Sequence, residues 1–277
     1  MIKPLAKRIT KSAYMIENSF LKSLSVVTPE FVYYYINQLV TFGCAYLIGT
    51  GQYGTQMSDM FMKHSTAWAV SIRIAALILA VLPLIWSFVK EYPVILPKEQ
   101  KRAGHIMLTV MLAASSAIFL NVMLSMTGFV SKSDSFVKTA TAQFSLPIWM
   151  GVLVYGIVTP VTEEIVHRGI IYNRLRRYYN LPIAVIFGSL LFGLSHGNLV
   201  QFVYGFLMGI IISCLYERYG AFVYPVLFHC IANTAVYVFM SIPVLRVASF
   251  SVIGIVIQLL ISIGAIYLIF GTKSIDT

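Results

Sequence analysis

Eight runs of mostly apolar residues, most of them near the length that crosses a bilayer, constrain the fold of this 277-residue chain more than any other feature. A transmembrane helix needs about 20 consecutive apolar residues. Composition agrees, because 58% of the residues are hydrophobic and only 11% are charged. The sequence therefore predicts an all-α polytopic membrane protein. The predicted spans are residues 31–50, 67–89, 104–126, 146–171, 182–197, 199–216, 221–241 and 250–270.

The hairpin between the fifth and sixth apolar runs has almost no connecting segment. The fifth run is short, and Gly197-Asn198 leaves little room for a full turn outside the membrane. Irregular backbone is tolerated at membrane depth where it lines a cavity, so we expect this hairpin to turn within the membrane. In the sixth run, Gly205-x-x-x-Gly209 is a small-residue pattern typical of helix packing.

Basic residues predict the orientation, because Lys and Arg concentrate in cytoplasmic loops. With the first 30 residues inside, fifteen Lys and Arg fall on the cytoplasmic side and four on the outer side. Both termini are therefore predicted to be cytoplasmic, in a cell membrane of the bacterial type. The basic segment 1–30 lacks the apolar core and cleavage site of a signal peptide, so it is expected to remain as a cytoplasmic amphipathic segment. Membrane orientation accounts for the net charge of +10 without a nucleic-acid partner.

Charged residues interrupt the fourth apolar run. Glu163, Glu164 and Arg168 lie in a stretch that is otherwise apolar, apart from His167. A charge at the bilayer centre costs about 2.5–3.5 kcal/mol on insertion scales, so such residues usually mark a functional interior. Positions four apart share a helix face, so Glu164 can pair with Arg168 while Glu163 projects elsewhere. That pair is compatible with a purely structural role as well as with a catalytic one.

Three polar residues on later spans are expected to meet these charges. His196 follows Phe192 by four residues at the end of the fifth run, and the seventh run places His229 and Asn233 on one helix face. Their depths predict that they converge with Glu163 in a cavity that opens toward the cytoplasmic leaflet. Each histidine alone is compatible with an ordinary core position, but together with Glu163 and Asn233 they indicate a catalytic site.

The ordered set of motifs resembles the CAAX prenyl protease and bacteriocin-processing family, also called the Abi or CPBP intramembrane proteases. The family pattern is E-E-x-x-x-R, then F-x-x-x-H, then H-x-x-x-N, and this chain matches it without departure. The matching residues are Glu163, Glu164, Arg168, Phe192, His196, His229 and Asn233. The resemblance covers roughly residues 146–241 and leaves out the first three spans and the last.

The expected organisation follows from that coverage. A basic N-terminal segment occupies residues 1–30, and the first three spans occupy residues 31–145. The protease-like core with four spans occupies residues 146–241, and residues 242–277 hold the last span and a short cytoplasmic tail.

The resemblance implies hydrolysis of a peptide bond in or near the membrane. By resemblance, Glu163 and His196 activate a water molecule as the general base, while His229 and Asn233 stabilise the oxyanion. General-base action contributes about 10²–10⁴-fold, and one oxyanion donor about 10²–10³-fold. The expected partners are the lipid bilayer and a membrane-associated peptide or protein, such as a leader or signalling peptide rather than a prenylated CAAX protein.

By the same resemblance, Glu164 and Arg168 support the site. Two versions of the chemistry at the site stay open. Glu163, His196 and His229 supply the two-His, one-carboxylate set that a catalytic Zn²⁺ accepts. The spacing is not H-E-x-x-H, however, and the same residues fit a metal-free mechanism in which Glu163 takes the proton directly. The sequence slightly favours a site that uses Zn²⁺ or another divalent metal.

Two other functions are compatible with the sequence. The segment from Gly193 to Gly197 matches G-x-S-x-G, so a serine intramembrane protease would pair Ser195 with His229. That pattern needs a strand–turn–helix context, which this apolar segment lacks, and it leaves Glu163 without a task. The other alternative is a membrane immunity or scaffold protein that keeps the fold and acts by binding a partner.

Other polar residues of the spans have simpler interpretations. His167 is expected behind the site or at the lipid interface, and Arg73, which falls inside a span, is expected to extend to the outer interface. Arg174, Arg176 and Arg177 are expected to contact lipid headgroups.

Overall fold

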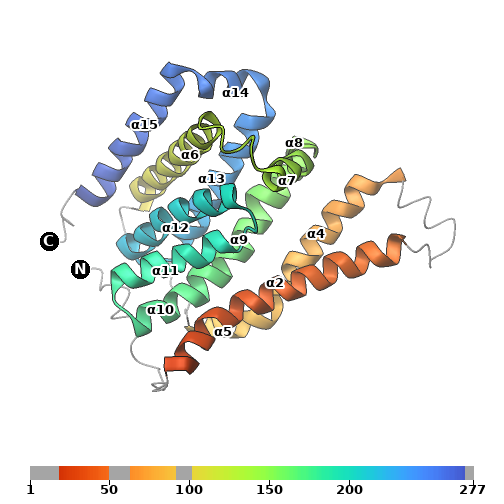
Figure 1. Cartoon of the computed structure of the whole chain (residues 1–277). Helices are drawn as coiled ribbons and strands as arrows, with labels where there is room; N and C mark the ends of the chain where they lie inside the picture. Colours follow the sequence, from red (N-terminus) through yellow and green to blue (C-terminus); the bar gives the residue numbers. More distant parts are fainter. Residues whose placement is uncertain (1–18, 50–62, 92–101, 272–277) are drawn as a thin grey trace.

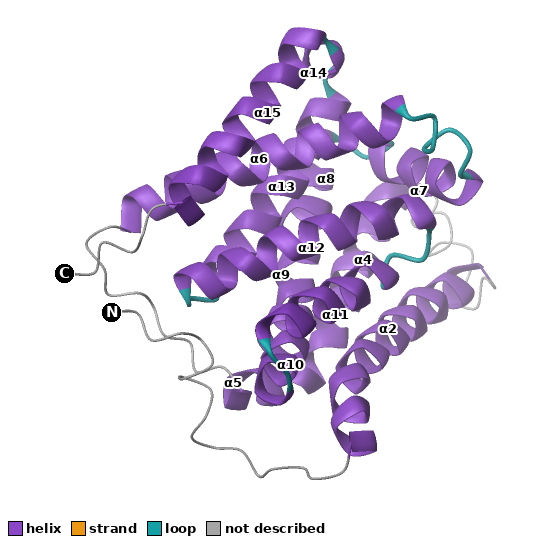
Figure 2. Ribbon diagram, turned by 60° about the vertical axis from the view of Figure 1, so that its left-hand side comes forward, coloured by secondary structure: helices purple, strands orange, loops and turns teal. Residues whose placement is uncertain are grey.

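The computed structural model describes residues 19–49, 63–91 and 102–271. Regular structure within these ranges is helical, with no strand (Figure 2). Seven of the described helices are long and apolar enough to cross a membrane, and an eighth apolar helix, Leu181–Leu194, is shorter. They correspond to the eight predicted runs, so the predicted fold class is confirmed. The seven longer helices are Phe20–Ile48, Ser65–Glu91, Ala103–Met126, Ile148–Tyr178, Leu199–Tyr219, Val223–Ser241 and Val252–Gly271.

The fourth span is assembled from several helical pieces with different turn widths. It runs through α8, η2, α9, η3 and α10, and both η2 and η3 have the wider π-helical turn. Such turns are rare inside α-helices and often occur at functional sites. The described elements are, in order, α2 (Ser19–Gly49), α4 (Ser65–Val81), η1 (Leu82–Leu84), α5 (Ile85–Glu91), α6 (Arg102–Met126), α7 (Asp134–Phe144), α8 (Ile148–Gly151), η2 (Val152–Val158), α9 (Thr159–Glu164), η3 (Ile165–Tyr172), α10 (Asn173–Tyr178), α11 (Leu181–Leu194), α12 (Leu199–Tyr219), α13 (Val223–Ser241), α14 (Pro243–Phe250), α15 (Val252–Ile266) and η4 (Tyr267–Gly271).

The fourth span contacts helices on both sides of the molecule. Figure 1 shows α2 and α4 as a pair at one side, and the two helices contact each other. The fourth span packs against this pair through α9 and η3 and against α13 through η2 and α9. On the far side, α6 packs against α13 and α15.

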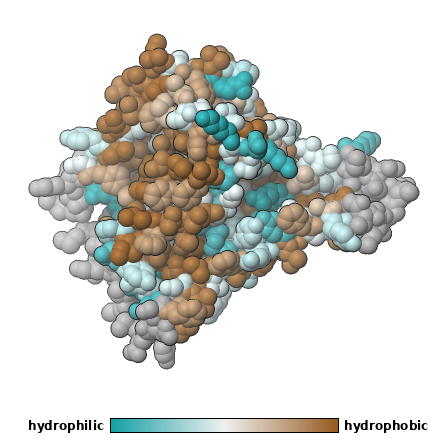
Figure 3. All heavy atoms as spheres, viewed as in Figure 1, coloured by the Kyte–Doolittle hydropathy of each residue, from teal (hydrophilic) through white to brown (hydrophobic). Residues whose placement is uncertain are grey.

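Two clusters of buried apolar side chains hold these helices together. One cluster joins the α2–α5 side to the fourth span and includes Leu77, Phe88 and Ile170. The other joins α6 to α12 and α13 and includes Leu112 and Met208. Large apolar side chains also cover much of the outer surface (Figure 3), as expected where a protein faces lipid tails.

The first span begins earlier than the sequence predicted. It starts at Phe20 instead of residue 31 and continues through Pro29 without a break. Proline has no N–H to donate to the carbonyl four residues earlier, which is that of Ser25. Arg174 of α10 donates to this carbonyl instead. A contact from another helix therefore replaces the hydrogen bond that Pro29 cannot make.

Two short helices of the structure lie between predicted spans. Both α7 and α14 fall between the predicted spans, because they are too short or too polar to be recognised as apolar runs. Figure 1 shows α7, α8 and α14 at one end of the bundle and α5 and α10 toward the other. Residues 1–18 of the predicted N-terminal segment 1–30 and residues 272–277 of the predicted C-terminal tail lie outside the described residues, and the predicted orientation remains a prediction.

Small residues bring α11 and α12 together, as their spacing predicted. A Cβ atom added to Gly205 would lie 3.4 Å from the Cα of Gly193 and 3.4 Å from the ring of His196. Gly197, with φ of +73°, forms the tight turn between the two helices, and Asn198 caps α12. This close approach fixes the position of His196 at the end of α11.

Candidate functional site

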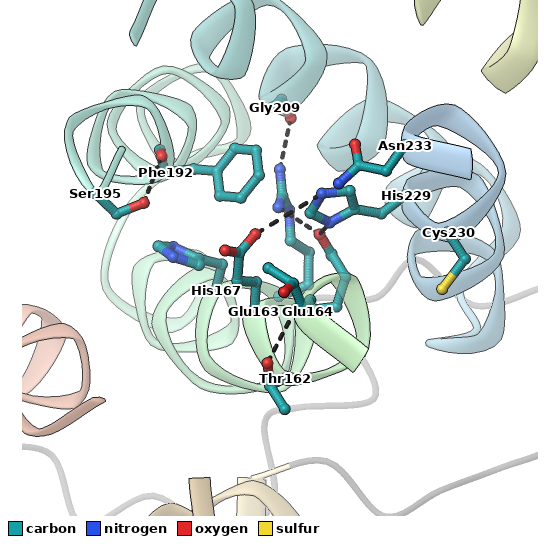
Figure 4. A network of polar contacts seen from close by, with 12 residues as sticks. Thr162, Glu163, Glu164, His167, Phe192, Ser195, Gly209, His229, Cys230 and Asn233 are labelled. Carbon is teal, nitrogen blue, oxygen red and sulfur yellow. Dashed lines mark hydrogen bonds and ion pairs between the residues drawn. The ribbon is translucent and has the colours of Figure 1, made fainter. Parts of the chain in front are cut away.

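A fully buried carboxylate, that of Glu164, lies at the centre of the polar network in the bundle. Its Oε1 accepts hydrogen bonds from Arg168 Nη1 and from His229 Nδ1, each at 2.8 Å. Arg168, whose side chain is only 1% exposed, also donates from Nη2 to the carbonyl of Gly209 at 3.2 Å. These bonds connect the fourth span to α13 and α12 (Figure 4). The predicted pairing of Glu164 with Arg168 is present.

Phe192 packs among the charged and imidazole groups of the site. The Arg168 guanidinium lies 4.5 Å from the centre of its ring. The rings of His196 and His229 meet it edge-on at centroid distances of 5.1 and 5.4 Å. A cation over an aromatic face is stabilised by the ring quadrupole. Phe192 thus contacts three residues of the sequence motifs, Arg168, His196 and His229, and fixes the directions of their side chains.

Glu163 faces His229 from the next position on the helix. Its Oε2 lies 3.8 Å from His229 Nε2, and its side chain remains 15% exposed. An ionised Glu164 can only accept, so the hydrogen of His229 lies on Nδ1 and directs Nε2 toward Glu163. The distance of 3.8 Å is too long for a direct hydrogen bond and is compatible with a bridging water.

His196 and Asn233 complete the predicted group. Nδ1 of His196 lies 2.9 Å from the carbonyl of Phe192, so this nitrogen is occupied by its own helix. Asn233 donates one amide hydrogen to the carbonyl of Tyr155 at 3.2 Å, which leaves the second hydrogen for another acceptor. Both side chains line two cavities, and His229 lines the smaller of these with them.

Two cavities adjoin these residues. The smaller one, about 20 Å³, is lined in part by His196, His229 and Asn233, and this volume is enough for a single water molecule. The larger one, about 120 Å³, is lined by His196 and Asn233 and by side chains of α7, including Phe136. Three of the four predicted residues therefore line a space of the right size for water, and Glu163 lies next to one of them, His229.

The larger cavity lies toward the α7 end of the bundle, because side chains of α7 and α13 border it. The segment that holds α7 was assigned to the outer side, so the predicted orientation and the predicted opening toward the cytoplasmic leaflet do not agree for this cavity. Both stay predictions. At the other end, Arg174 and Arg177 pair with Glu91, and Arg176 pairs with Glu217, so these arginines bind carboxylates of the protein.

Ser195 has a different environment. Its hydroxyl donates to the carbonyl of Phe192 at 2.8 Å and lies 3.3 Å from His196 Nδ1. No contact within the described part of the chain joins it to His229, its expected partner in a serine mechanism, and it lines neither of the two cavities. The geometry gives Ser195 a role in ending α11.

His167 is buried behind the site instead of facing lipid. Its side chain is 2% exposed, and its ring meets Phe192 edge-on at 5.0 Å. Nε2 lies 3.2 Å from a carboxylate oxygen of Glu30, but neither atom makes a hydrogen bond of good geometry among the described residues, so we treat the pair as an electrostatic contact. Sequence reasoning missed Glu30, because it was assigned to the segment before the first span.

Tyr204 is a second residue that sequence reasoning missed. Its side chain lines both cavities next to His196 and Asn233. Its hydroxyl is buried and has no hydrogen-bond partner among the described residues. An unpartnered buried hydroxyl is costly, which suits a group that binds water or substrate. A single tyrosine in an apolar run carries no signal that the sequence alone reveals.

The expected metal set agrees with zinc in chemical kind but not in placement. Glu163, His196 and His229 are suitable donors, and the other nitrogens of both histidines are already occupied, as is usual for ligands. Across residues 19–49, 63–91 and 102–271, however, no group of three or more His, Cys, Asp or Glu side chains could hold a metal ion. The three donors are not grouped as ligands in this arrangement, and the expected metal ion stays a prediction.

Comparison with known proteins matches the segment that holds the site. Residues 145–235 match the family described as "Type II CAAX prenyl endopeptidase Rce1-like". The "Putative membrane peptidase YdiL" of Bacillus subtilis (strain 168) is 32% identical over 93 residues, which are 34% of this chain and 38% of that protein. The "Uncharacterized 24.3 kDa protein" of Escherichia coli is 29% identical over 130 residues, 45% of this chain and 60% of that protein. Each match spans less than two thirds of the relative's length, and no solved structure matches.

Substitutions at the buried ion pair are expected to destabilise the protein. Glu164→Gln or Arg168→Met alone leaves one charge buried without its partner, at a cost of about 3–5 kcal/mol in the free energy of unfolding. The double variant is expected to lose less than the sum of the two. Denaturant unfolding in detergent micelles measures this coupling.

The same cycle on Arg176 and Glu217 provides the control. This pair is less buried, with side chains 10% and 14% exposed, so its coupling is expected to be smaller. Strict additivity for Glu164 and Arg168 would show that the two side chains do not stabilise each other.

Proposed function

We propose that this multi-pass membrane protein is an intramembrane endopeptidase, because residues 145–235 match the Rce1-like family of CAAX prenyl endopeptidases and a relative is described as a putative membrane peptidase. Its substrate is a peptide, or a segment of a membrane protein, that reaches the cavity within the bilayer. The single observation that supports this function best is the placement of Glu163 opposite Nε2 of His229, which lines a water-sized cavity together with His196 and Asn233.

Glu163 acts as the base in the proposed reaction. It takes a proton from a water molecule while the water oxygen attacks the carbonyl carbon of the scissile bond. His196, whose Nδ1 is held by the Phe192 carbonyl, directs its free nitrogen to the same water. The protonated Glu163 then gives its proton to the departing amine as the C–N bond breaks. Proton transfer of this kind contributes about 10²–10⁴-fold to the rate.

His229 and Asn233 stabilise the oxyanion that forms on the substrate carbonyl. Asn233 has one amide hydrogen left for it, and His229 donates from Nε2 in its protonated form. Glu164 stabilises that positive charge through Nδ1, while Arg168 holds Glu164 in place. Glu164 and Arg168 are therefore positioning residues.

We further propose that both termini lie on the cytoplasmic side of a bacterial cell membrane. The distribution of Lys and Arg supports this orientation. Both relatives with reported matches come from bacteria. In this orientation the larger cavity faces the outer half of the bilayer.

Glu163→Gln is expected to abolish cleavage without loss of membrane insertion, because the water loses its base and the isosteric amide preserves packing. Ser195→Ala is expected to change activity little. Mass spectrometry of peptides released from membranes with wild-type or variant protein, at matched protein abundance, measures both effects.

Other outcomes of this comparison favour the alternatives. Activity that survives Glu163→Gln but is lost in Ser195→Ala would support a serine protease. A biological phenotype that persists in Glu163→Gln, with no peptide released even by the wild-type protein, would support an immunity or scaffold function.

Tyr204→Phe is expected to lower the turnover number by about 10-fold or more, which corresponds to the loss of one hydrogen bond to bound water or substrate. Thermal stability is expected to stay unchanged or to rise, because the hydroxyl has no partner to lose. Tyr219→Phe, which also removes a buried hydroxyl but lines neither cavity, is the matched control. Equal turnover in wild type and Tyr204→Phe would remove Tyr204 from the site.

Metal analysis distinguishes the two versions of the chemistry. In the metal-free version, in which Glu163 takes the proton directly, protein that elemental analysis shows to be metal-free is expected to retain full activity. The opposite result would be a purified protein that contains close to one metal ion, loses activity with a membrane-permeant chelator and recovers it with zinc. It would show that Glu163 is not the sole activator of water.

A further inference from the structure

Arg73 takes no part in the proposed reaction, although it lies within the second candidate span. A cationic side chain inside a span usually faces a cavity or the protein interior and marks a site. Its Nη1 donates to Oδ1 of Asn37 at 2.8 Å. Within the described part of the chain, no carboxylate lies within ion-pair distance of its guanidinium. Arg73 therefore has a fixed direction but no compensating charge there.

Asn37 holds the guanidinium deep in the membrane. At a rise of 1.5 Å per residue, Arg73 lies about 8 Å from the middle of its span and Asn37 about 5 Å from the middle of its own. The edge of the hydrocarbon lies about 15 Å from the midplane. The structure shows Arg73 donating to Asn37, and its expected extension to the outer interface stays a prediction.

The guanidinium borders a cavity with other hydrogen-bonding groups. This cavity has a volume of about 390 Å³ and is lined by Arg73 and Thr66 of α4, by Ser145, and by Tyr155 of η2. Figure 3 shows polar surface in the recess between α4 and the end of the bundle that carries α7 and α8 in Figure 1. A cavity with one cation and several hydroxyl groups is suited to an anionic ligand.

The Arg73 cavity adjoins the candidate site through Tyr155. Tyr155 lines it, and the carbonyl of the same residue accepts the hydrogen bond from Asn233. The Tyr155 ring also stacks on Tyr237, which lines the 120 Å³ cavity, at a centroid distance of 6.3 Å. One residue of the fourth span thus separates the two cavities.

We propose that Arg73 binds a carboxylate of the peptide substrate and thereby determines which peptides are cleaved; this rests on the proposed endopeptidase function. The planar guanidinium matches the geometry of a carboxylate, and low polarity around it strengthens the pair. Tyr155 precedes Glu163 by about 12 Å of helix, which an extended peptide covers in about four residues. The carboxylate is therefore expected about four residues from the cleaved bond.

An Asp or Glu side chain and a free chain terminus supply the same chemistry, so the test separates them. Apolar peptides with a diazirine photolabel are made in four matched forms, with Glu or Gln near one end and with a terminal acid or amide. The full-length Glu163→Gln protein, in phosphatidylcholine nanodiscs, is labelled with each form, and labelled residues are mapped by mass spectrometry. This readout requires binding but no cleavage.

At least one acidic form is expected to label the segments 65–73 or 142–155 about 10- to 100-fold more than the neutral form, as for a charge-assisted hydrogen bond. Adding Arg73→Gln is expected to remove this difference, and Arg73→Lys is expected to retain part of it in protein that folds normally. Arg246→Gln, which changes an exposed arginine of α14, is the matched control and is expected to have no effect.

Equal labelling by acidic and neutral forms, or unchanged labelling in Arg73→Gln, would overturn the assignment. Carboxylate-dependent labelling that is lost when phosphatidylglycerol replaces part of the phosphatidylcholine would assign the site to a lipid and would also overturn it.

Cleavage of the same peptides by proteins with Glu163 intact separates this proposal from the proposed function. Carboxylate-dependent labelling without any cleavage by the wild type would reject the endopeptidase and keep the Arg73 site. Equal cleavage of all four forms by wild type and Arg73→Gln would keep the endopeptidase and reject Arg73 as its specificity residue.

Discussion

The buried carboxylate of Glu164 is the group on which the arrangement of the site depends. A buried charge is costly unless it is paired and hydrogen-bonded. Arg168 and His229 donate to one of its oxygens from two different helices, and Arg168 extends the connection to Gly209 of α12. Any movement of these helices relative to each other would leave a charge without a partner. The network therefore holds the fourth span, α12 and α13 at one relative position.

The adjacent carboxylates illustrate how environment separates two roles. Neighbouring residues on a helix point in directions about 100° apart, so Glu163 cannot share the pocket of Glu164. Glu164 has no exposed surface, whereas Glu163 remains 15% exposed and faces Nε2 of His229. The rigid neighbour fixes the backbone and His229, while the freer carboxylate can exchange protons with water. Glu164 thus positions the groups that Glu163 requires for the proposed chemistry.

The two ends of the fourth span have different structures. At the α10 end, arginines pair with Glu91 and Glu217, and one of them, Arg174, also supports the helix turn at Pro29. At the other end, π-helical η2 lines the Arg73 cavity and contributes the Tyr155 carbonyl that holds Asn233. The 120 Å³ cavity and the Arg73 cavity, which are lined by polar groups, lie at this second end. We infer that substrate reaches Glu163 from there.

The sequence by itself determined the all-helical membrane class, because apolar runs of bilayer length have few other folds. It also identified the polar residues that converge, because charges in such runs are too costly to lack partners. It did not reveal Tyr204, Glu30 or the cavity at Arg73, since ordinary residue types at unremarkable spacing carry no pattern. Their roles depend on which helices lie side by side and at what depth. The direction of the cavity and the continuity of α2 through Pro29 were likewise decided by contacts between helices distant in sequence, which only tertiary packing brings within hydrogen-bonding distance.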